Sequence, residues 1–499
     1  MSFISNLSQR TKRALAWGVC AVMVGAVILT VALVTYVPRS QTLRILNWED
    51  YMPRSVIQDF EKKVRNATGK KFRVKYETAE SNEHMYRMIA TKKSDYDLIC
   101  VSEYMFERMF IEKLLLPINF TSAHTNVNDY ATEVMDPINE IFKERAVQAG
   151  YESADDVEGM TFAVPYVYGT NGIMVNPKKI YGSSSSGTTA GTTNGITLTE
   201  EQLKAVRGDM KSWGVLWNEK NTNVANGGAP TGTGEGQVNR NYTGLVSMKN
   251  VARDAYSAAL LYHFKDELLG VDGDLLLERI MQEAPDTTNS FLALAEAALK
   301  EQKNTLGMIS KQSGYEEESG KYRMSDTRLN RLPAIGLYWS CDAGFVMSDN
   351  KDIEFYVPDQ GSNWWVDAWV MPKFAVNKST AIDFLDFISE KDNAIKNMKY
   401  TGSTSAVTEA RTTYYNELKN QEVGNHADAK FFKNTSKFSK TDDEWNTWRE
   451  MYLATIFPAG SADTTIANDV LDRCKLFRYL GGTNDTTIGK MWSGVKSSK

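Results

Sequence analysis

Three short stretches of the chain place an aromatic ring close to a carboxylate. The groups are Trp48 with Asp50 and Tyr51, Trp339 with Asp342, and Trp365 with Asp367. The face of an aromatic ring attracts an ammonium group by roughly 0.5 to 2 kcal/mol, and carboxylates accept hydrogen bonds from its N–H groups. The rings can also cover methylene groups that separate two charges. This chemistry favours an organic amine as the ligand over a sugar or an anion.

Asp367 lies in the stretch GSNWWVDAWVMP, residues 361–372. If this stretch is a strand, alternation places Asp367 on one face together with Trp365 and Trp369, and Trp364 on the opposite face. The carboxylate would then share its face with two indole rings. We expect Trp365 to face the ligand and Trp369 to pack in the core.

Simpler interpretations of these residues stay open on pattern alone. Asp367 could be a solvated acid at the end of a strand, Asp342 could terminate its own strand, and Asp50 could cap a following helix. Trp339 and Trp365 could be ordinary core aromatics. Whether each of these five residues binds a ligand or has only a structural role must therefore be decided from the rest of the chain.

Patterns typical of catalytic and metal sites do not occur in the sequence. The four histidines are scattered, and there is no HExxH motif, cysteine pair or nucleophile elbow. The one glycine cluster, at residues 231–236, lies in low-complexity sequence rather than between a strand and a helix, which argues against a phosphate-binding loop. We therefore expect a binding protein that is not an enzyme and that uses no cofactor and no metal.

The balance of charge argues against nucleic acid as a partner. The chain has 57 basic and 62 acidic residues, and residues 1–40 contain four of the basic residues and no acid, which leaves 53 − 62 = −9 for the remainder. This excess of acid disfavours nucleic-acid binding and accommodates a cationic partner.

The N-terminal part of the chain has the composition of a membrane anchor. Residues 14–38 carry no charge and are numerous enough to cross a bilayer as one helix. The basic residues before them favour a cytoplasmic location for residues 1–13. The apolar run ends without the small residues of a signal-peptidase site, so we expect an uncleaved single-pass anchor rather than a cleaved export signal. The predicted location is the cell membrane, with the binding domain extracellular or periplasmic.

Strand and helix patterns alternate after the anchor. Residues 43–48, 72–78 and 96–101 have the pattern of strands, and helical patterns lie between them. This alternation predicts a parallel sheet, in which ligands bind beyond the carboxyl ends of the strands. Trp48, Asp50 and Tyr51 follow the first of these strands, and Ser102 and Tyr104 follow the third.

Seven motifs in the chain resemble, in the same order, those of the extracytoplasmic spermidine/putrescine-binding proteins of ABC importers. They are LNWEDYMP, YETAESNEHMYRMI, YDLICVSEYMFERM, VPYVYGTNGIMVN, SWGVLW, YWSCDAG and WWVDAWVMP. The resemblance covers nearly all of the chain from about Leu43. It implies a protein that is not an enzyme, but captures a polyamine, putrescine or spermidine, and delivers it to an ABC permease with its associated ATPase.

The same resemblance implies an α/β fold of the two-lobed, clamshell type (type II periplasmic-binding-protein fold), preceded here by the transmembrane helix. Lobe 1 would comprise residues 42–165 and about 367–440, and lobe 2 residues 166–366 and about 441–499. Two stretches rich in serine, glycine and threonine, at 181–197 and 220–241, would be flexible insertions in lobe 2.

The family's ligand contacts can be transferred position by position. The residues that match them are Trp48, Asp50, Tyr51, Ser102, Tyr104, Asp254, Trp339, Asp342, Trp365 and Asp367. Val251 replaces an aspartate of spermidine-binding members, Ser403 replaces a tyrosine, and Asp342 matches an acid of putrescine-specific members. The acids therefore resemble a diamine site more than a triamine site, and another cationic ligand stays possible.

Two other functions are compatible with the same fold. The protein could be a receptor that binds a cationic small molecule and signals through a partner, because only about a dozen residues precede the span. It could also be a clamshell protein reused as a surface adhesin. Genes for a permease and an ATPase beside this one would favour import.

Overall fold

The structure is a computed structural model of the chain. It describes residues 36–91, 94–184, 196–219, 242–286, 288–306, 333–348, 350–420, 443–458 and 470–498, with a few single residues and short pieces outside these ranges. Within the described residues, no helix combines the length and the apolar character needed to cross a membrane. Most of residues 1–13 and of the predicted anchor, residues 14–38, lie outside the described part.

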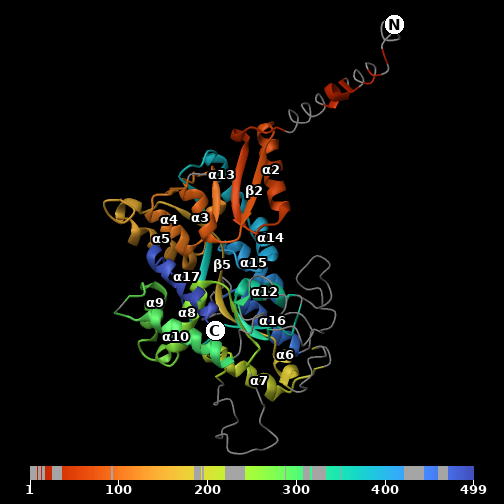
Figure 1. Cartoon of the computed structure of the whole chain (residues 1–499). Coiled ribbons are helices and arrows are strands. Elements are labelled where there is room, and N and C mark those ends of the chain that lie inside the picture. Colours follow the sequence, from red (N-terminus) through yellow and green to blue (C-terminus); the bar gives the residue numbers. More distant parts are fainter. Residues whose placement is uncertain are drawn as a thin grey trace, which may run out of the picture.

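The upper lobe in Figure 1 begins with a parallel βαβαβ unit. Its elements are β1 (Thr42–Trp48), α2 (Arg54–Thr68), β2 (Arg73–Ala79), α3 (Asn82–Ala90) and β3 (Leu98–Ser102). Gly69 ends α2 with a φ of 66°, a left-handed conformation that favours glycine. The side chain of Ser81 caps α3 by accepting the backbone N–H of His84. The alternating strands and helices predicted for this region are confirmed.

Two long antiparallel strands, β5 (Ala163–Val175) and β10 (Ser362–Pro372), connect the two halves of the sheet. The strand order is β2-β1-β3-β10-β5, followed by β8 (Ile335–Trp339), β6 (Val246–Lys249) and β7 (Tyr315–Glu316). β10 pairs with β3 of the upper lobe, whereas the last residues of β5 pair with β8 in the other half. Both lobes are therefore attached to one central pair of strands.

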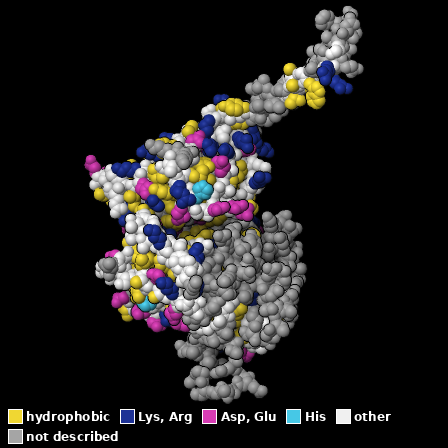
Figure 2. Space-filling model, viewed as in Figure 1, with side chains coloured by type: hydrophobic (Ala, Val, Ile, Leu, Met, Phe, Trp, Pro, Cys, Tyr) yellow, Lys and Arg dark blue, Asp and Glu magenta, His cyan; other side chains and the backbone are white. Residues whose placement is uncertain are grey.

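The remaining elements complete the two lobes. The other strands that the structure describes are β4 (Leu115–Leu116), β6 (Val246–Lys249), β7 (Tyr315–Glu316), β8 (Ile335–Trp339), β9 (Glu354–Tyr356) and β11 (Cys474–Leu476). The upper lobe also contains α4 (Glu103–Ile111), α5 (Thr132–Arg145), α13 (Lys378–Ile388), α14 (Lys391–Thr401) and α15 (Thr408–Lys419). The lower lobe contains α6 (Pro177–Ser184), α7 (Glu200–Asp209), α8 (Ala252–His263), α9 (Gly273–Gln282), α10 (Phe291–Leu306), α12 (Ser340–Met347), α16 (Asp443–Ile456) and α17 (Gly482–Ser497). Figure 2 shows a waist between the lobes, with acidic side chains at the adjoining edge of the upper lobe.

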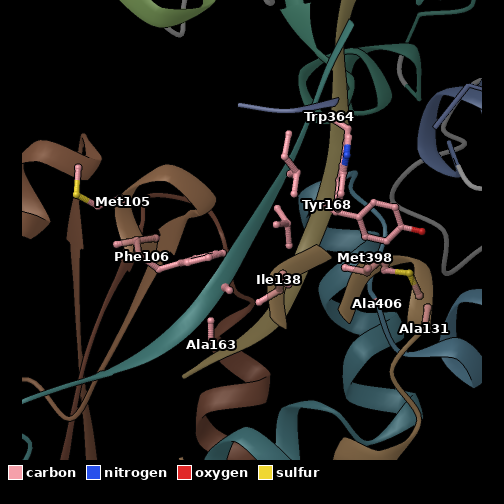
Figure 3. Close-up of a cluster of buried hydrophobic side chains, with 14 of the residues drawn as sticks. Met105, Phe106, Ala131, Ile138, Ala163, Tyr168, Trp364, Met398 and Ala406 are labelled. Carbon is pink, nitrogen blue, oxygen red and sulfur yellow. The ribbon is translucent and has the colours of Figure 1, made fainter. Parts of the chain in front are cut away.

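β10 separates two hydrophobic clusters by strict alternation of its side chains. Trp364 belongs to the cluster drawn in Figure 3, where it lies near Tyr168 with 6.5 Å between ring centroids. Trp365 and Trp369 belong to a different cluster, and Trp369 is fully buried against Tyr166. The predicted opposition of Trp364 and Trp365 is confirmed, as is the packing of Trp369 in the core.

The two predicted insertions are only partly described. Helix α6 extends to Ser184, so residues 181–184 are helical and not part of a flexible loop as predicted. The rest of the first insertion, apart from residues 193, 196 and 197, and all of the second, residues 220–241, lie outside the described residues.

Candidate ligand-binding site

Asp367 is a buried acid held by hydroxyl groups. It lies in the middle of β10, opposite Ser102 in the pairing with β3, and only 6% of its surface is exposed. The Ser102 hydroxyl donates to Oδ1 and the Tyr51 hydroxyl to Oδ2, each at 2.6 Å. Burial raises the pKa of Asp367, while these two hydrogen bonds act in the opposite direction. Asp367 is therefore not a solvated acid at a strand end.

Asn82 at the start of α3 connects the side chains that follow β3. Its Nδ2 group donates to the hydroxyls of Ser102 and Tyr104, both at 3.0 Å, and its Oδ1 accepts the backbone N–H of Ser102 at 3.1 Å. The Tyr104 hydroxyl in turn donates to Glu83 at 3.1 Å. Asn82 thus fixes the orientation of two predicted site residues, a role that the sequence did not indicate.

Glu103 is a second buried carboxyl group beside Asp367. It lies at the start of α4 and accepts the backbone N–H of Val366 at 3.1 Å. Burial raises the pKa of Glu103 to about 8, and repulsion from Asp367 contributes to the shift. At neutral pH Glu103 is therefore mainly protonated, which leaves Asp367 as the principal negative charge of this half of the site.

The raised pKa of Glu103 predicts a pH dependence of stability. The folded protein holds a proton on Glu103 between about pH 4.5 and pH 8, whereas the unfolded chain does not, so the free energy of unfolding falls as pH rises through this window. Glu103→Gln is expected to reduce the loss between pH 5 and pH 8 by roughly 1–4 kcal/mol. Urea unfolding of both proteins at each pH measures this difference. Equal pH slopes would show that Glu103 is ionised in the folded state.

The lower lobe supplies an acid of its own, Asp254, in the first turn of α8. Its Oδ1 accepts Asn171 Nδ2 at 3.1 Å, and its Oδ2 accepts the indole N–H of Trp339 at 2.8 Å. Burial raises the pKa of Asp254, and the Trp339 hydrogen bond opposes that shift. Trp339 is the last residue of β8, so its ring lies at the carboxyl end of that strand.

Lys249 contacts two residues of the lower lobe that were predicted to bind an amine, Trp339 and Asp342. Its Nζ atom is 3.2 Å from the centroid of the Trp339 ring and forms an ion pair with the Asp342 carboxylate. Lys249 is only 9% exposed and Asp342 only 5%. Asp342 lies in the first turn of α12, so it does not terminate a strand. The sequence did not indicate Lys249 as a site residue.

Arg253 connects the two lobes across the site. Its guanidinium carbon lies 3.8 Å from the centroid of the Tyr104 ring on α4. The same side chain pairs with Asp485 of α17 at 2.8 Å and donates to the backbone oxygen of Arg478 at 2.8 Å. A cation of the lower lobe thus covers an aromatic ring of the upper lobe, which is the arrangement of a closed clamshell.

The predicted tryptophans and Tyr51 gather around one buried cluster. Trp48, Tyr51 and Trp339 all pack against the cluster that contains Trp365, and we call these four residues the aromatic cluster. A β-carbon at Gly169 would lie 2.6 Å from the Trp365 ring, so glycine at this position allows the indole to approach β5. The indole N–H groups of Trp48 and Trp365 are buried and have no acceptor among the described residues.

Asp50 is the predicted site residue that the structure places apart from the others. It is exposed, adopts a φ of 51°, and its Oδ1 lies 3.4 Å from the Tyr400 hydroxyl. It does not cap α2, because Pro53 occupies the N-cap position and no side chain provides a cap hydrogen bond there. The other nine predicted residues lie in three sets. Tyr51, Ser102 and Tyr104 lie with Asp367 and form the Asp367 group, Trp339 lies with Asp254 and Asp342, and Trp48 and Trp365 belong to the aromatic cluster.

Known proteins resemble this chain over most of its length. The spermidine/putrescine-binding periplasmic protein of Escherichia coli (strain K12) is 22% identical over 400 residues, 79% of this chain and 86% of that protein. The putrescine-binding periplasmic protein PotF of the same organism is 21% identical over 383 residues, 74% of this chain and 79% of that protein. The resemblance inferred from the sequence motifs is therefore confirmed.

Solved structures show the same fold. A candidate spermidine/putrescine ABC transporter of Listeria monocytogenes is 19% identical, with a TM-score of 0.54 over 92% of this chain and 100% of that one. The Tp0655 (TpPotD) lipoprotein of Treponema pallidum is 17% identical, with a TM-score of 0.53 over 91% of this chain and 99% of that one. The predicted two-lobed α/β fold of periplasmic binding proteins is confirmed.

A family model places the chain among proteins that bind solutes rather than transform them. The model for bacterial extracellular solute-binding proteins matches residues 55–425, about three quarters of the sequence. As predicted, the protein is not an enzyme: the chain belongs to the family of bacterial extracellular solute-binding proteins.

Proposed function

We propose that this protein captures an amine of the polyamine class between its two lobes and delivers it to the permease of an ABC importer. The relatives that bind spermidine and putrescine support this ligand class. The observation that carries the proposal is Asp367, a buried carboxylate whose only partners among the described residues are two hydroxyl groups. A buried acid in this state is costly unless a cation joins it.

The surroundings of Asp367 suit an ammonium group. A carboxylate offers about four lone-pair positions, and the hydroxyls of Tyr51 and Ser102 use two of them, so acceptor capacity remains for N–H donors. The aromatic cluster supplies ring faces for the cation and apolar surface for the methylene chain. An amine would thus regain at this site the hydrogen bonds and the electrostatic stabilisation that it loses on leaving water.

Closure of the lobes would complete the site. Tyr51, Ser102 and Asp367 belong to the upper lobe, whereas Asp254 and Trp339 belong to the lower lobe. A ligand shifts the balance between open and closed states only through its different affinity for them. Contacts from both lobes to one ligand provide that difference.

A thermal-shift panel tests this function directly. Putrescine, spermidine, cadaverine, cationic amino acids and the amino alcohol 4-amino-1-butanol are added to the exported part of the chain, and a ligand present at 100 times its Kd is expected to stabilise it by about 2.7 kcal/mol. An increase in Tm with at least one of these amines, and none with glucose or glutamate, is the expected result. The absence of a shift with every amine would contradict the proposal.

We also propose that residues 14–38 anchor the protein in the cell membrane, with the lobes outside. Removal of residues 1–35 is expected to move the protein from the membrane fraction to the soluble fraction. This boundary keeps Arg39, which pairs with Asp95 at 2.6 Å and with Asp97 at 2.9 Å and therefore belongs to the folded lobe. A truncated protein that stays with the membrane would contradict the anchor.

A further inference from the structure

We propose that Lys249 permanently occupies one of the two amine positions of this site, so that the ligand carries a single ammonium group, bound at Asp367, and an uncharged far end. The inference rests on the proposed function and narrows its ligand class to monocationic amines, such as amino alcohols or diamines acylated at one end. Lys249 is then a residue that determines specificity, although it needs no direct bond to the ligand.

The position of the Lys249 ammonium matches that of a bound amine. It lies on the face of Trp339, 3.2 Å from the ring centroid, and pairs with the Asp342 carboxylate. A ring face and a carboxylate are the two groups that recognise an organic cation. A ligand ammonium placed there would meet the like charge of Lys249 at short range in a buried setting, where repulsion is strong. A second ligand ammonium is therefore excluded while Lys249 stays in place.

The location of Lys249 in the fold argues that it does stay in place. Lys249 is the last residue of β6, and Trp339 is the last residue of the parallel neighbour β8, so the sheet itself places the two side chains together. Lys249 is 9% exposed, and its departure would leave Asp342 buried without the lysine ammonium. Separating such a pair is costly because a buried carboxylate loses the ammonium group beside it.

The charges of the lower lobe also disfavour an anionic far end. Asp254, Asp342 and Asp485 face Lys249 and Arg253, a sum of −1 when all five groups are ionised. A ligand carboxylate would add to this excess. An uncharged oxygen is compatible with it and could accept a hydrogen bond from the buried indole N–H of Trp365, which has no acceptor among the described residues and whose ring lies near Gly169, where Ser340 also approaches.

The upper lobe, in contrast, places no cation of its own at its amine position in the part of the chain that the structure describes. No cation contacts Asp367 among the described residues, and its hydrogen-bond partners are the neutral hydroxyls of Tyr51 and Ser102. The site therefore has one carboxylate available for a ligand ammonium and one already matched by the protein's own ammonium. This asymmetry is what a monocationic amine requires.

Calorimetric titration with two probes of equal length tests the inference. Putrescine has an ammonium at each end, whereas 4-amino-1-butanol replaces one of them with a hydroxyl group. The wild-type protein is expected to bind 4-amino-1-butanol at least as tightly as putrescine. Lys249→Met should reverse this order and increase putrescine affinity tenfold or more, because the second ligand ammonium can then reach Trp339 and Asp342.

The double variant Lys249→Met/Asp342→Asn is the matched control, since it removes both charges of the pair. It should fold, and it should lack the gain in putrescine affinity. Wild-type protein that prefers putrescine at least tenfold, with no gain in Lys249→Met, would overturn the inference and leave the proposed function intact. If no amine binds to the wild type or to either variant, the proposed function itself fails.

Discussion

Asp367→Asn is expected to lower the affinity for an amine ligand by about 100-fold or more, while the unliganded protein stays folded. Loss of one partner of a buried charged pair typically costs 2–5 kcal/mol of binding free energy. Asparagine keeps the size of the side chain, and the hydroxyls of Tyr51 and Ser102, which donate to Asp367 at 2.6 Å, can still bond to its amide. Titration calorimetry with the best amine of the thermal-shift panel measures the loss.

The stability of the unliganded variant separates a ligand contact from a structural role. Burial raises the pKa of Asp367, so the ionised acid is costly without a ligand, and asparagine should leave the free energy of unfolding unchanged or raise it. An acid retained only for folding would instead lose stability on substitution. Unchanged amine affinity in Asp367→Asn would remove this residue from the site.

Asp50→Asn is the comparison variant for the same titration. It removes one negative charge from the same end of the sheet, but Asp50 is exposed and its carboxylate lies near the Tyr400 hydroxyl. Solvent screens an exposed charge, so its effect on affinity should stay below about fivefold. Equal losses in the two variants would indicate a general effect of charge rather than contact between Asp367 and the ligand.

Local patterns predicted those parts of the site whose residues lie at the ends of recognisable strands. β3 has a continuous apolar pattern and β1 also has the pattern of a strand, so the positions of Trp48, Tyr51, Ser102 and Tyr104 followed from the rule that ligands bind beyond the carboxyl ends of parallel strands. Alternation along β10 correctly assigned Trp364 and Trp365 to opposite faces. These inferences needed only neighbours in sequence and the geometry of a strand.

Lys249 could not be predicted in this way. Its strand β6 has four residues and follows a low-complexity stretch, so it lacks the long alternating run that reveals a strand. Its partner Asp342 is 93 residues away, and only the parallel pairing of β6 with β8 brings the two elements together. The same holds for Asn82 and Asn171, because the identity of an amide residue does not disclose the groups that it will connect.

The largest effect on stability is expected from Glu107, a fully buried acid in α4 of the upper lobe. Its Oε1 accepts Arg145 at 2.6 Å and Arg478 at 3.0 Å, and its Oε2 accepts Arg478 at 3.0 Å and the backbone N–H of Tyr479 at 2.8 Å. Glu107→Gln would leave two guanidinium groups without this carboxylate. The expected loss is about 3–5 kcal/mol of unfolding free energy, measured by urea denaturation.

Glu144→Gln provides the matched control, because Glu144 binds the same arginine from a different environment. It accepts Arg478 Nη1 at 2.7 Å, but its side chain is 48% exposed, so the loss should be below about 1 kcal/mol. Arg478 lies between β11 and α17, and Glu107 thereby fastens the upper lobe to the segment that leads into the last helix of the lower lobe. The contacts of Glu107 lie outside the Asp367 group. At a temperature where Glu107→Gln is still folded, its amine affinity should therefore stay close to that of the wild type, although its free energy of unfolding is much lower. Equal losses of unfolding free energy in Glu107→Gln and Glu144→Gln would mean that the burial of Glu107 does not strengthen its contact with Arg478.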